Sequence, residues 1–86
     1  FRAFRKALDV PLLANMTEFG KTPYITVEEF RKLGYNMVIF PLTLLRVAGR
    51  AMEEVLKELA THGTQKDFLH RMQTREELYT LLNYVP

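Results

Sequence analysis

The 86-residue chain, with 48% hydrophobic residues, is long enough for at most one small globular domain, near the size at which a core becomes marginal. Its net charge is only +2, from 12 basic and 10 acidic residues mixed along the sequence, and no basic stripe with interleaved aromatic residues predicts nucleic-acid binding. The absence of cysteine excludes disulfides and thiolate metal sites within these residues, and no apolar run is long enough to cross a bilayer.

The first half of the sequence predicts a helix end, a strand and a loop. Residues 1–8 have the apolar spacing of the last turns of a helix. A short strand is predicted over residues 11–15, because an apolar run follows Pro11. The loop that follows, residues 17–25, contains two residues that interrupt regular structure, Gly20 and Pro23.

A helix and a second strand follow this loop. Thr26 and Glu29 have the spacing of a capping box, which predicts a helix over residues 27–33. Gly34 predicts the left-handed residue that ends this helix. The strand predicted over residues 35–40 contains a continuous apolar run, which is typical of a parallel strand covered on both faces.

The second half of the sequence predicts helices only. A long amphipathic helix is expected over residues 42–61, with Gly63 ending it. A short helical segment over 66–71 precedes a second capping box, residues 74–77, which predicts a last helix reaching about Asn83.

The predicted order of elements indicates an α/β fold with a parallel sheet and a right-handed crossover. Two parallel strands cannot cover one another, so the strands that should flank them are expected outside these residues. The pattern fits a quarter of a βα-barrel or the edge of a doubly wound sheet, and we expect the chain to be a piece of a longer polypeptide.

The strongest candidate for a binding site is the polar segment directly after the first strand. Asn15, Thr17 and Glu18 lie where a parallel strand ends, and ligands bind at that edge of parallel α/β sheets. Arg46 lies in the first turn of the long helix, just past the second strand. Periodicity alone favours a solvated arginine there, but a helix start disfavours a cation, so a nearby anion would explain it better. An amide, a hydroxyl and a guanidinium meeting at this edge would bind a carboxylate or phosphate.

The remaining candidates are weaker. Arg75 occupies the first turn of the last helix, where a surface role is the simpler interpretation. Glu18 alone is weak evidence for a general acid or base, since no second carboxylate accompanies it. His62 and His70 do not have the spacing of metal ligands and are predicted to lie on the surface. The chain contains no recognisable nucleophile–base pair and no metal site.

Several motifs resemble one known family. The run LANMTEFG, residues 13–20, resembles the loop after the seventh strand of methylisocitrate lyases, a branch of the isocitrate lyase/phosphoenolpyruvate mutase superfamily. Thr-Glu-Phe-Gly after the asparagine is typical of this branch. Further segments resemble the family in the same order, and together they cover nearly the whole chain: Thr22–Pro23, Phe40–Arg46, Gly63–Lys66 and Met72–Tyr79.

This resemblance implies a (β/α)8 TIM barrel, of which residues 1–86 are the C-terminal segment, from the end of the sixth helix through about strands seven and eight. It implies a Mg²⁺-dependent carbon–carbon lyase of propionate catabolism, in the methylcitrate cycle, that cleaves 2-methylisocitrate to pyruvate and succinate. Asn15, Met16 and Thr17 would bind the substrate carboxylate, with Arg46 and Arg75 as further contacts. The metal ligands and the catalytic residues would lie upstream, outside this chain.

The resemblance also implies partners and location. Such enzymes pair their subunits by exchanging C-terminal helices, usually as tetramers, and a cytoplasmic location is expected. Two alternatives stay open. One is a sister activity of the superfamily, a phosphonomutase or an oxaloacetate decarboxylase, because residues that choose between these activities lie largely upstream. The other is a non-catalytic barrel fragment, and the 86 residues alone are expected to be inactive.

Overall fold

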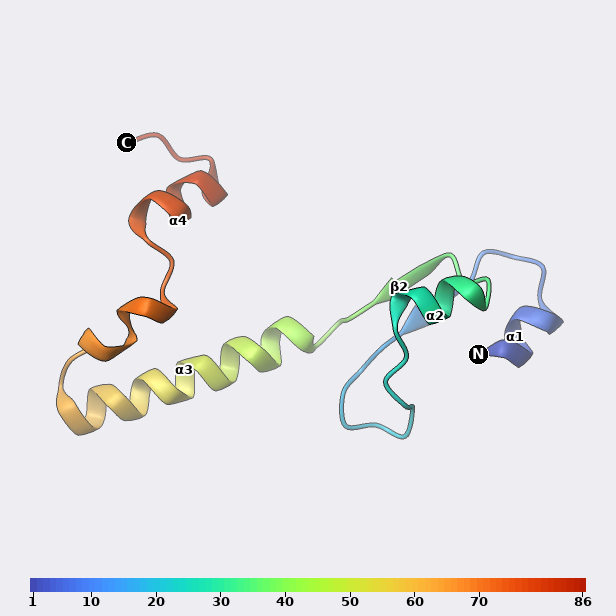
Figure 1. The fold of residues 1–86 in the computed structure, drawn as a ribbon, viewed down its shortest axis with the longest axis horizontal. Coiled ribbons are helices and arrows are strands. Elements are labelled where there is room, and N and C mark those ends of the chain that lie inside the picture. Colours follow the sequence, from blue (N-terminus) through green and yellow to red (C-terminus); the bar gives the residue numbers. More distant parts are fainter. The chain divides into compact units, whose positions relative to one another are not determined.

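The computed structural model describes residues 1–86, which form two compact parts, Phe1–Gly49 and Arg50–Pro86. The elements follow the predicted order, and their mixture of helices and strands confirms the α/β class (Figure 1). In chain order they are α1 (Arg2–Ala7), β1 (Leu13–Asn15), α2 (Val27–Lys32), β2 (Met37–Ile39), α3 (Thr43–His62), η1 (Lys66–Arg71) and α4 (Arg75–Leu82). No helix is both long and apolar enough to cross a membrane.

The two strands form a parallel pair, as predicted, with α2 in the connection between them. Their register joins Leu13 to Met37, Ala14 to Val38 and Asn15 to Ile39. Each strand has three residues, fewer than the predicted spans 11–15 and 35–40. At the start of the pair the Leu12 carbonyl accepts the backbone N–H groups of Asn36 and Met37 at 3.0 and 3.2 Å, and the side-chain oxygen of Asn36 accepts the N–H of Leu12 at 2.9 Å.

Helix α2 has the predicted capping box. The Thr26 hydroxyl accepts the N–H of Glu29 at 3.1 Å, and the Glu29 carboxylate accepts the N–H of Thr26 at 3.2 Å. Gly34 follows the helix with a φ of 87°, the left-handed conformation expected for it. A Cβ at this position would lie 3.1 Å from the Arg5 side chain, which gives a second reason for glycine.

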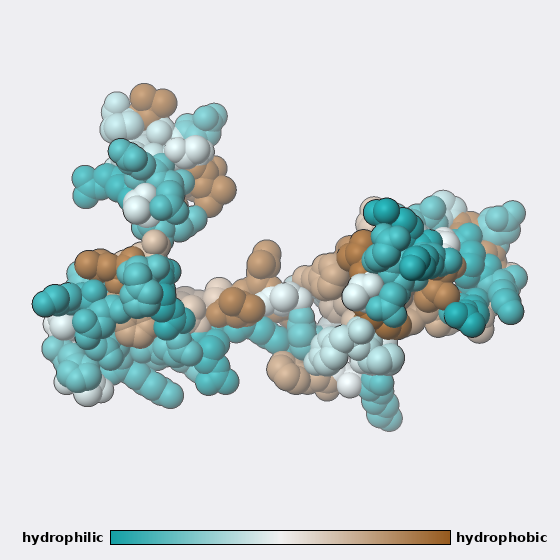
Figure 2. Space-filling view, in the orientation of Figure 1, coloured by the Kyte–Doolittle hydropathy of each residue, from teal (hydrophilic) through white to brown (hydrophobic).

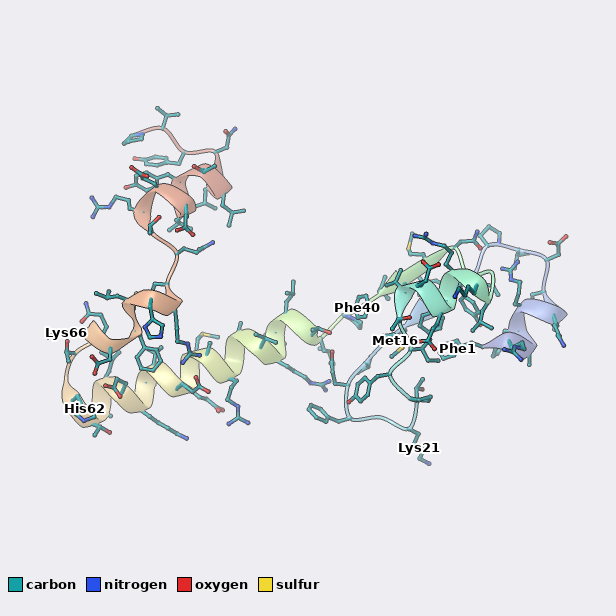
Figure 3. The ribbon with its side chains drawn as sticks, in the orientation of Figure 1. Phe1, Met16, Lys21, Phe40, His62 and Lys66 are labelled. Carbon is teal, nitrogen blue, oxygen red and sulfur yellow. The ribbon has the colours of Figure 1, made fainter.

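The core of the first part lies between the sheet and α2. Ala14, Met16 and Phe30 are buried, and Phe30 is the only one of them with a large side chain that is fully inaccessible. The Phe30 ring meets the Phe1 ring edge-on, with centroids 4.8 Å apart, and lies 5.5 Å from the Tyr35 ring. Met16 and Phe1 both lie beside α2 in Figure 3. Aromatic packing around one phenylalanine therefore fixes α2 on the sheet.

The opposite face of the sheet is open. Successive side chains of a strand point to opposite faces, and the residues alternating with Ala14 and Val38 remain exposed: Leu13 (50%), Met37 (56%) and Ile39 (36%). The covering of this second face is expected from elements outside these 86 residues, and it stays a prediction. The apolar residues suited to a second covering layer are present, but the chain itself supplies only one layer.

In the second part, α3 ends at His62 and is followed by Gly63, with a φ of 66°, as predicted. Figure 3 shows His62 and Lys66 on either side of the turn that leads into η1. The ion pair between Arg71 and Glu54, at 2.8 Å, joins η1 to α3. Large hydrophobic side chains along α3 are exposed, among them Met52, Leu56 and Leu59. Figure 2 shows hydrophobic surface in brown along this helix.

The second predicted capping box is only half formed. The Thr74 hydroxyl accepts the N–H of Glu77 at 3.1 Å, as in a capping box. The Glu77 carboxylate, however, bonds the Thr74 hydroxyl rather than the Thr74 backbone N–H. Helix α4 begins at the predicted place and ends at Leu82, and it is followed by the left-handed cap residue Asn83, which has a φ of 57°.

We predict that Phe30→Ala lowers the free energy of unfolding by about 3–5 kcal/mol, since it removes the one large, fully buried side chain between α2 and the sheet. Denaturant unfolding of the natural-length protein measures the change. Phe30→Leu keeps most of the volume and is expected to cost clearly less. Equal losses for the two variants would contradict this account of the core.

Candidate functional site

The loop after β1 and the first turn of α3 after β2 meet at one edge of the sheet. Parallel strands end at the same edge, and the paired residues Asn15 and Ile39 are the last of each strand. The N–H of Met16 donates to the carbonyl of Ile39 at 2.9 Å, which extends the pairing by one residue. The residues that follow in each segment, including Glu18 and Arg46, are thereby brought within reach of each other.

Glu18 is the centre of this site. One carboxylate oxygen accepts the hydroxyl of Thr43, and the other accepts Nη1 of Arg46 at 2.8 Å. The same Nη1 also donates to the backbone carbonyl of Glu18 at 3.2 Å. The Arg46 guanidinium lies over the Phe19 ring, 5.4 Å from its centroid. Phe19 has a φ of 63°, so a side chain in the left-handed region forms part of this arrangement.

The electrostatics of the site favour an ionised Glu18. Its pKa is lowered from the ordinary value of 4.5, first by the hydrogen bond from Thr43, then by a backbone N–H and by Arg46, although partial desolvation opposes the shift. The carboxylate also lies beside the start of α3, whose first turn has no acidic residue of its own. A helix N-terminus stabilises an anion, so Glu18 supplies from another segment the charge that α3 lacks.

The anion expected near Arg46 is therefore present within the chain. A cation at a helix start is better explained by a nearby negative charge, and the Glu18 carboxylate is that charge. The sequence pattern suggests for Glu18 only the role of a general acid or base. Residues 28 apart in the sequence form this pair. The available signal was the combination of an arginine in the first turn of α3 with no acidic residue in that turn.

Asn15 and Thr17 are hydrogen-bonded to each other. The Thr17 hydroxyl donates to Oδ1 of Asn15 at 2.9 Å, which leaves the Asn15 amide nitrogen as a donor to any bound anion. Met16, between them, is buried, and its N–H is already bonded to Ile39. Its side chain belongs to the core, and its place in the site is to hold the loop.

The other sequence candidates lie elsewhere. Arg75 is the first residue of α4, in the part Arg50–Pro86, and is exposed. His62 and His70 are both on the surface, as predicted, and His62 Nδ1 lies 3.0 Å from the Glu58 carboxylate one turn earlier in α3. No group of three His, Cys, Asp or Glu side chains is arranged to hold a metal ion.

The lowered pKa of Glu18 predicts how its contribution to stability varies with pH. The native pKa lies below 4.5, so the contribution is complete above pH 4.5 and is lost as the pH falls through the native pKa. Denaturant unfolding of the natural-length protein and its Glu18→Gln variant from pH 7 to pH 3 measures this contribution. The difference in the free energy of unfolding between the two should be constant at neutral pH and should shrink in acid. Glu53→Gln, in an exposed pair with Arg50 at 3.8 Å, is the control and should change stability little at neutral pH. A difference independent of pH would contradict the ion pair.

The sequence and fold are similar to known lyases. No protein-family model matches the chain. It is 56% identical to a 2-methylisocitrate lyase of Aeropyrum pernix and 54% identical to that of Bacillus subtilis, over 98% of its length in both cases. The Escherichia coli enzyme of the same name is 46% identical over the same share. The chain spans only 27–28% of the length of these relatives.

Among solved structures, a crystal structure of 2,3-dimethylmalate lyase, described as a member of the PEP mutase/isocitrate lyase superfamily, matches with a TM-score of 0.78 and 32% identity. The match covers 93% of this chain and 28% of that one. The resemblance indicated by the LANMTEFG run is thereby confirmed. The chain is homologous, over almost all of its residues, to a segment of the 2-methylisocitrate lyases.

Proposed function

We propose that the chain is part of a carbon–carbon lyase that cleaves 2-methylisocitrate to pyruvate and succinate. The observation that carries this proposal is the similarity to enzymes named 2-methylisocitrate lyase, at 46–56% identity over 98% of the chain. In this proposal the 86 residues would supply one edge of a substrate-binding site, and the activity would belong to the longer protein.

In this proposal the chain is the C-terminal segment of a single (β/α)8 TIM-barrel domain. β1 and β2 would be about the seventh and eighth strands, with α2 and α3 as the helices that follow them. Two features support this placement: the strands are parallel with a helix in the connection between them, and the sheet face opposite α2 carries uncovered apolar side chains. A closed barrel would provide both the missing neighbouring strands and a packed interior for that face.

Substrate contacts are proposed at the carboxyl ends of these strands, where barrel enzymes bind their ligands. Asn15 would donate its amide N–H to a carboxylate, with Thr17 orienting that amide and Met16 anchoring the loop in the core. Arg46 would supply positive charge from the start of α3. Arg75, at the start of α4, is the fifth proposed contact and is exposed as a ligand-binding side chain must be.

Magnesium is proposed as the cofactor of the complete enzyme, with ligands outside these residues. Mg²⁺ prefers carboxylate and water oxygens in octahedral array, and these 86 residues contain no suitable cluster. When bound, the ion would stabilise negative charge that develops on the substrate as the carbon–carbon bond breaks. The residues of this chain would bind and orient the carboxylate that lies away from the metal.

The assembly and the cellular context are proposed on the same basis. A homotetramer with exchanged C-terminal helices would cover the apolar side chains of α3 that remain exposed, such as Met52 and Leu56. The proposed substrate would place the enzyme in the methylcitrate cycle of propionate catabolism, and a cytoplasmic location is proposed with it.

A second candidate is a sister activity of the same superfamily. It is favoured by the similarity to 2,3-dimethylmalate lyase, at a TM-score of 0.78. 2-Methylisocitrate has three carboxylates and 2,3-dimethylmalate has two, so assays with both compounds distinguish the candidates. Phosphonomutase and oxaloacetate decarboxylase substrates complete the comparison. If none of these compounds is turned over, the non-catalytic fragment becomes the better interpretation.

We predict that Arg46→Ala in the natural-length protein lowers kcat/KM for 2-methylisocitrate by about 10- to 100-fold, the usual loss for one charged hydrogen-bond partner. Pyruvate release in the presence of Mg²⁺ measures the rate. Arg50→Ala is the matched control, because Arg50 is one helical turn further along α3 and has an exposed side chain (73%) in a long ion pair. Equal activities of wild type and Arg46→Ala would remove Arg46 from the substrate site.

A further inference from the structure

We propose that Glu18 is a positioning residue for Arg46: held by the Thr43 hydroxyl, its carboxylate binds one edge of the guanidinium and presents the other edge to the substrate carboxylate. This inference rests on the proposed function and adds a residue to it. Glu18 is not proposed as a catalytic residue, because its side chain contacts Thr43 and Arg46.

The geometry of the pair carries the argument. Arg46 makes both of its hydrogen bonds, to the side chain and to the carbonyl of Glu18, through the single nitrogen Nη1. Nε and Nη2 make no hydrogen bond within the chain. These two nitrogens form the side of the guanidinium with two parallel N–H groups, which matches the two oxygens of a carboxylate. The ion pair thus uses one part of the arginine and leaves free the edge best suited to the ligand.

The carboxylate of Glu18 is itself held in place. Thr43 occupies the first position of α3, and its hydroxyl binds the oxygen that does not bind Arg46. The side chain of Glu18 is 22% exposed and that of Arg46 is 39% exposed, so the pair is partly withdrawn from water. The Phe19 ring beneath the guanidinium limits its movement on another side. The long, flexible side chain of Arg46 is therefore held by two neighbours, Glu18 and Phe19, and Glu18 is held in turn by Thr43, before any ligand binds.

Preorganisation and simple electrostatics make opposite predictions for the loss of Glu18. If Glu18 were only a negative charge near a substrate anion, its neutralisation would tighten substrate binding. If it positions Arg46, neutralisation releases the guanidinium and weakens binding, because the arginine must then be ordered by the substrate itself. The direction of the change in KM separates the two.

The test is steady-state kinetics of the natural-length protein with 2-methylisocitrate, comparing wild type, Glu18→Gln and Glu53→Gln. We expect Glu18→Gln to raise KM about five- to tenfold with kcat within about twofold, the pattern of lost binding that is uniform between ground and transition states. Glu53→Gln, which removes an equal charge from an exposed pair on α3, should leave both constants unchanged. An unchanged or lowered KM for Glu18→Gln would overturn the proposal.

A double-mutant cycle shows whether Glu18 acts through Arg46. In the Arg46→Ala background, Glu18→Gln should have no further effect on KM; an additive loss would show a separate, structural role and overturn the proposal. Thr43→Val and Thr43→Ser give a second approach if Glu18→Gln does not fold. Thr43→Val should raise KM in the same direction, and Thr43→Ser, which keeps the hydroxyl, should restore it; equal KM values for the two would contradict the proposal.

The outcomes also separate this inference from the proposed function. If wild type does not cleave 2-methylisocitrate, or if Arg46→Ala is fully active, the proposed function fails at that step. If wild type is active and Arg46→Ala is impaired while Glu18→Gln binds substrate as wild type does, only the role of Glu18 fails.

Discussion

The parallel pairing of β1 with β2 is the constraint on which the first part of the molecule depends. Its register places Asn15 opposite Ile39, so the chain leaves both strands at the same edge of the sheet. The bond from Met16 to Ile39 continues this pairing into the loop. Without that register, Glu18 would not reach the start of α3, and the segment between the strands, α2, would not bring Phe30 onto Ala14 and Met16.

The covered and open faces of this small sheet differ for a simple reason. Only α2 is available to pack on it, and one helix covers one face. The apolar runs of both strands nevertheless provide side chains for a second layer, such as Leu13 and Met37. Continuous apolar strands are typical of sheets covered on both sides. The sequence therefore carries apolar side chains for both faces of the sheet, whereas these residues by themselves complete only half of the packing.

Local features could be predicted from the sequence, and long-range ones only in part. The Thr26 capping box and the left-handed Gly34 depend on residues within one turn, and both are as expected. Thr74 shows the limit of that reasoning, because the same residue spacing there forms the hydroxyl bonds of a capping box without the bond from the Glu77 carboxylate to the backbone N–H. The Glu18–Arg46 pair joins residues 28 apart in the sequence, and no local sequence pattern identifies Glu18 as the partner of Arg46. The sequence does show that Arg46, in the first turn of a helix, needs a negative charge nearby.

That need also explains why the site is built around a pair and not a bare cation. An arginine in the first turn of a helix is opposed by the helix dipole, and Glu18 offsets this by placing its carboxylate against Thr43 at the same helix start. The pair is neutral overall, so in the proposed function a substrate carboxylate would not be attracted by net charge alone. It would be recognised by the direction of the N–H groups that remain on Nε and Nη2. In the proposed site recognition would depend on orientation as well as charge, so the residue that fixes the arginine would contribute to binding through the arginine.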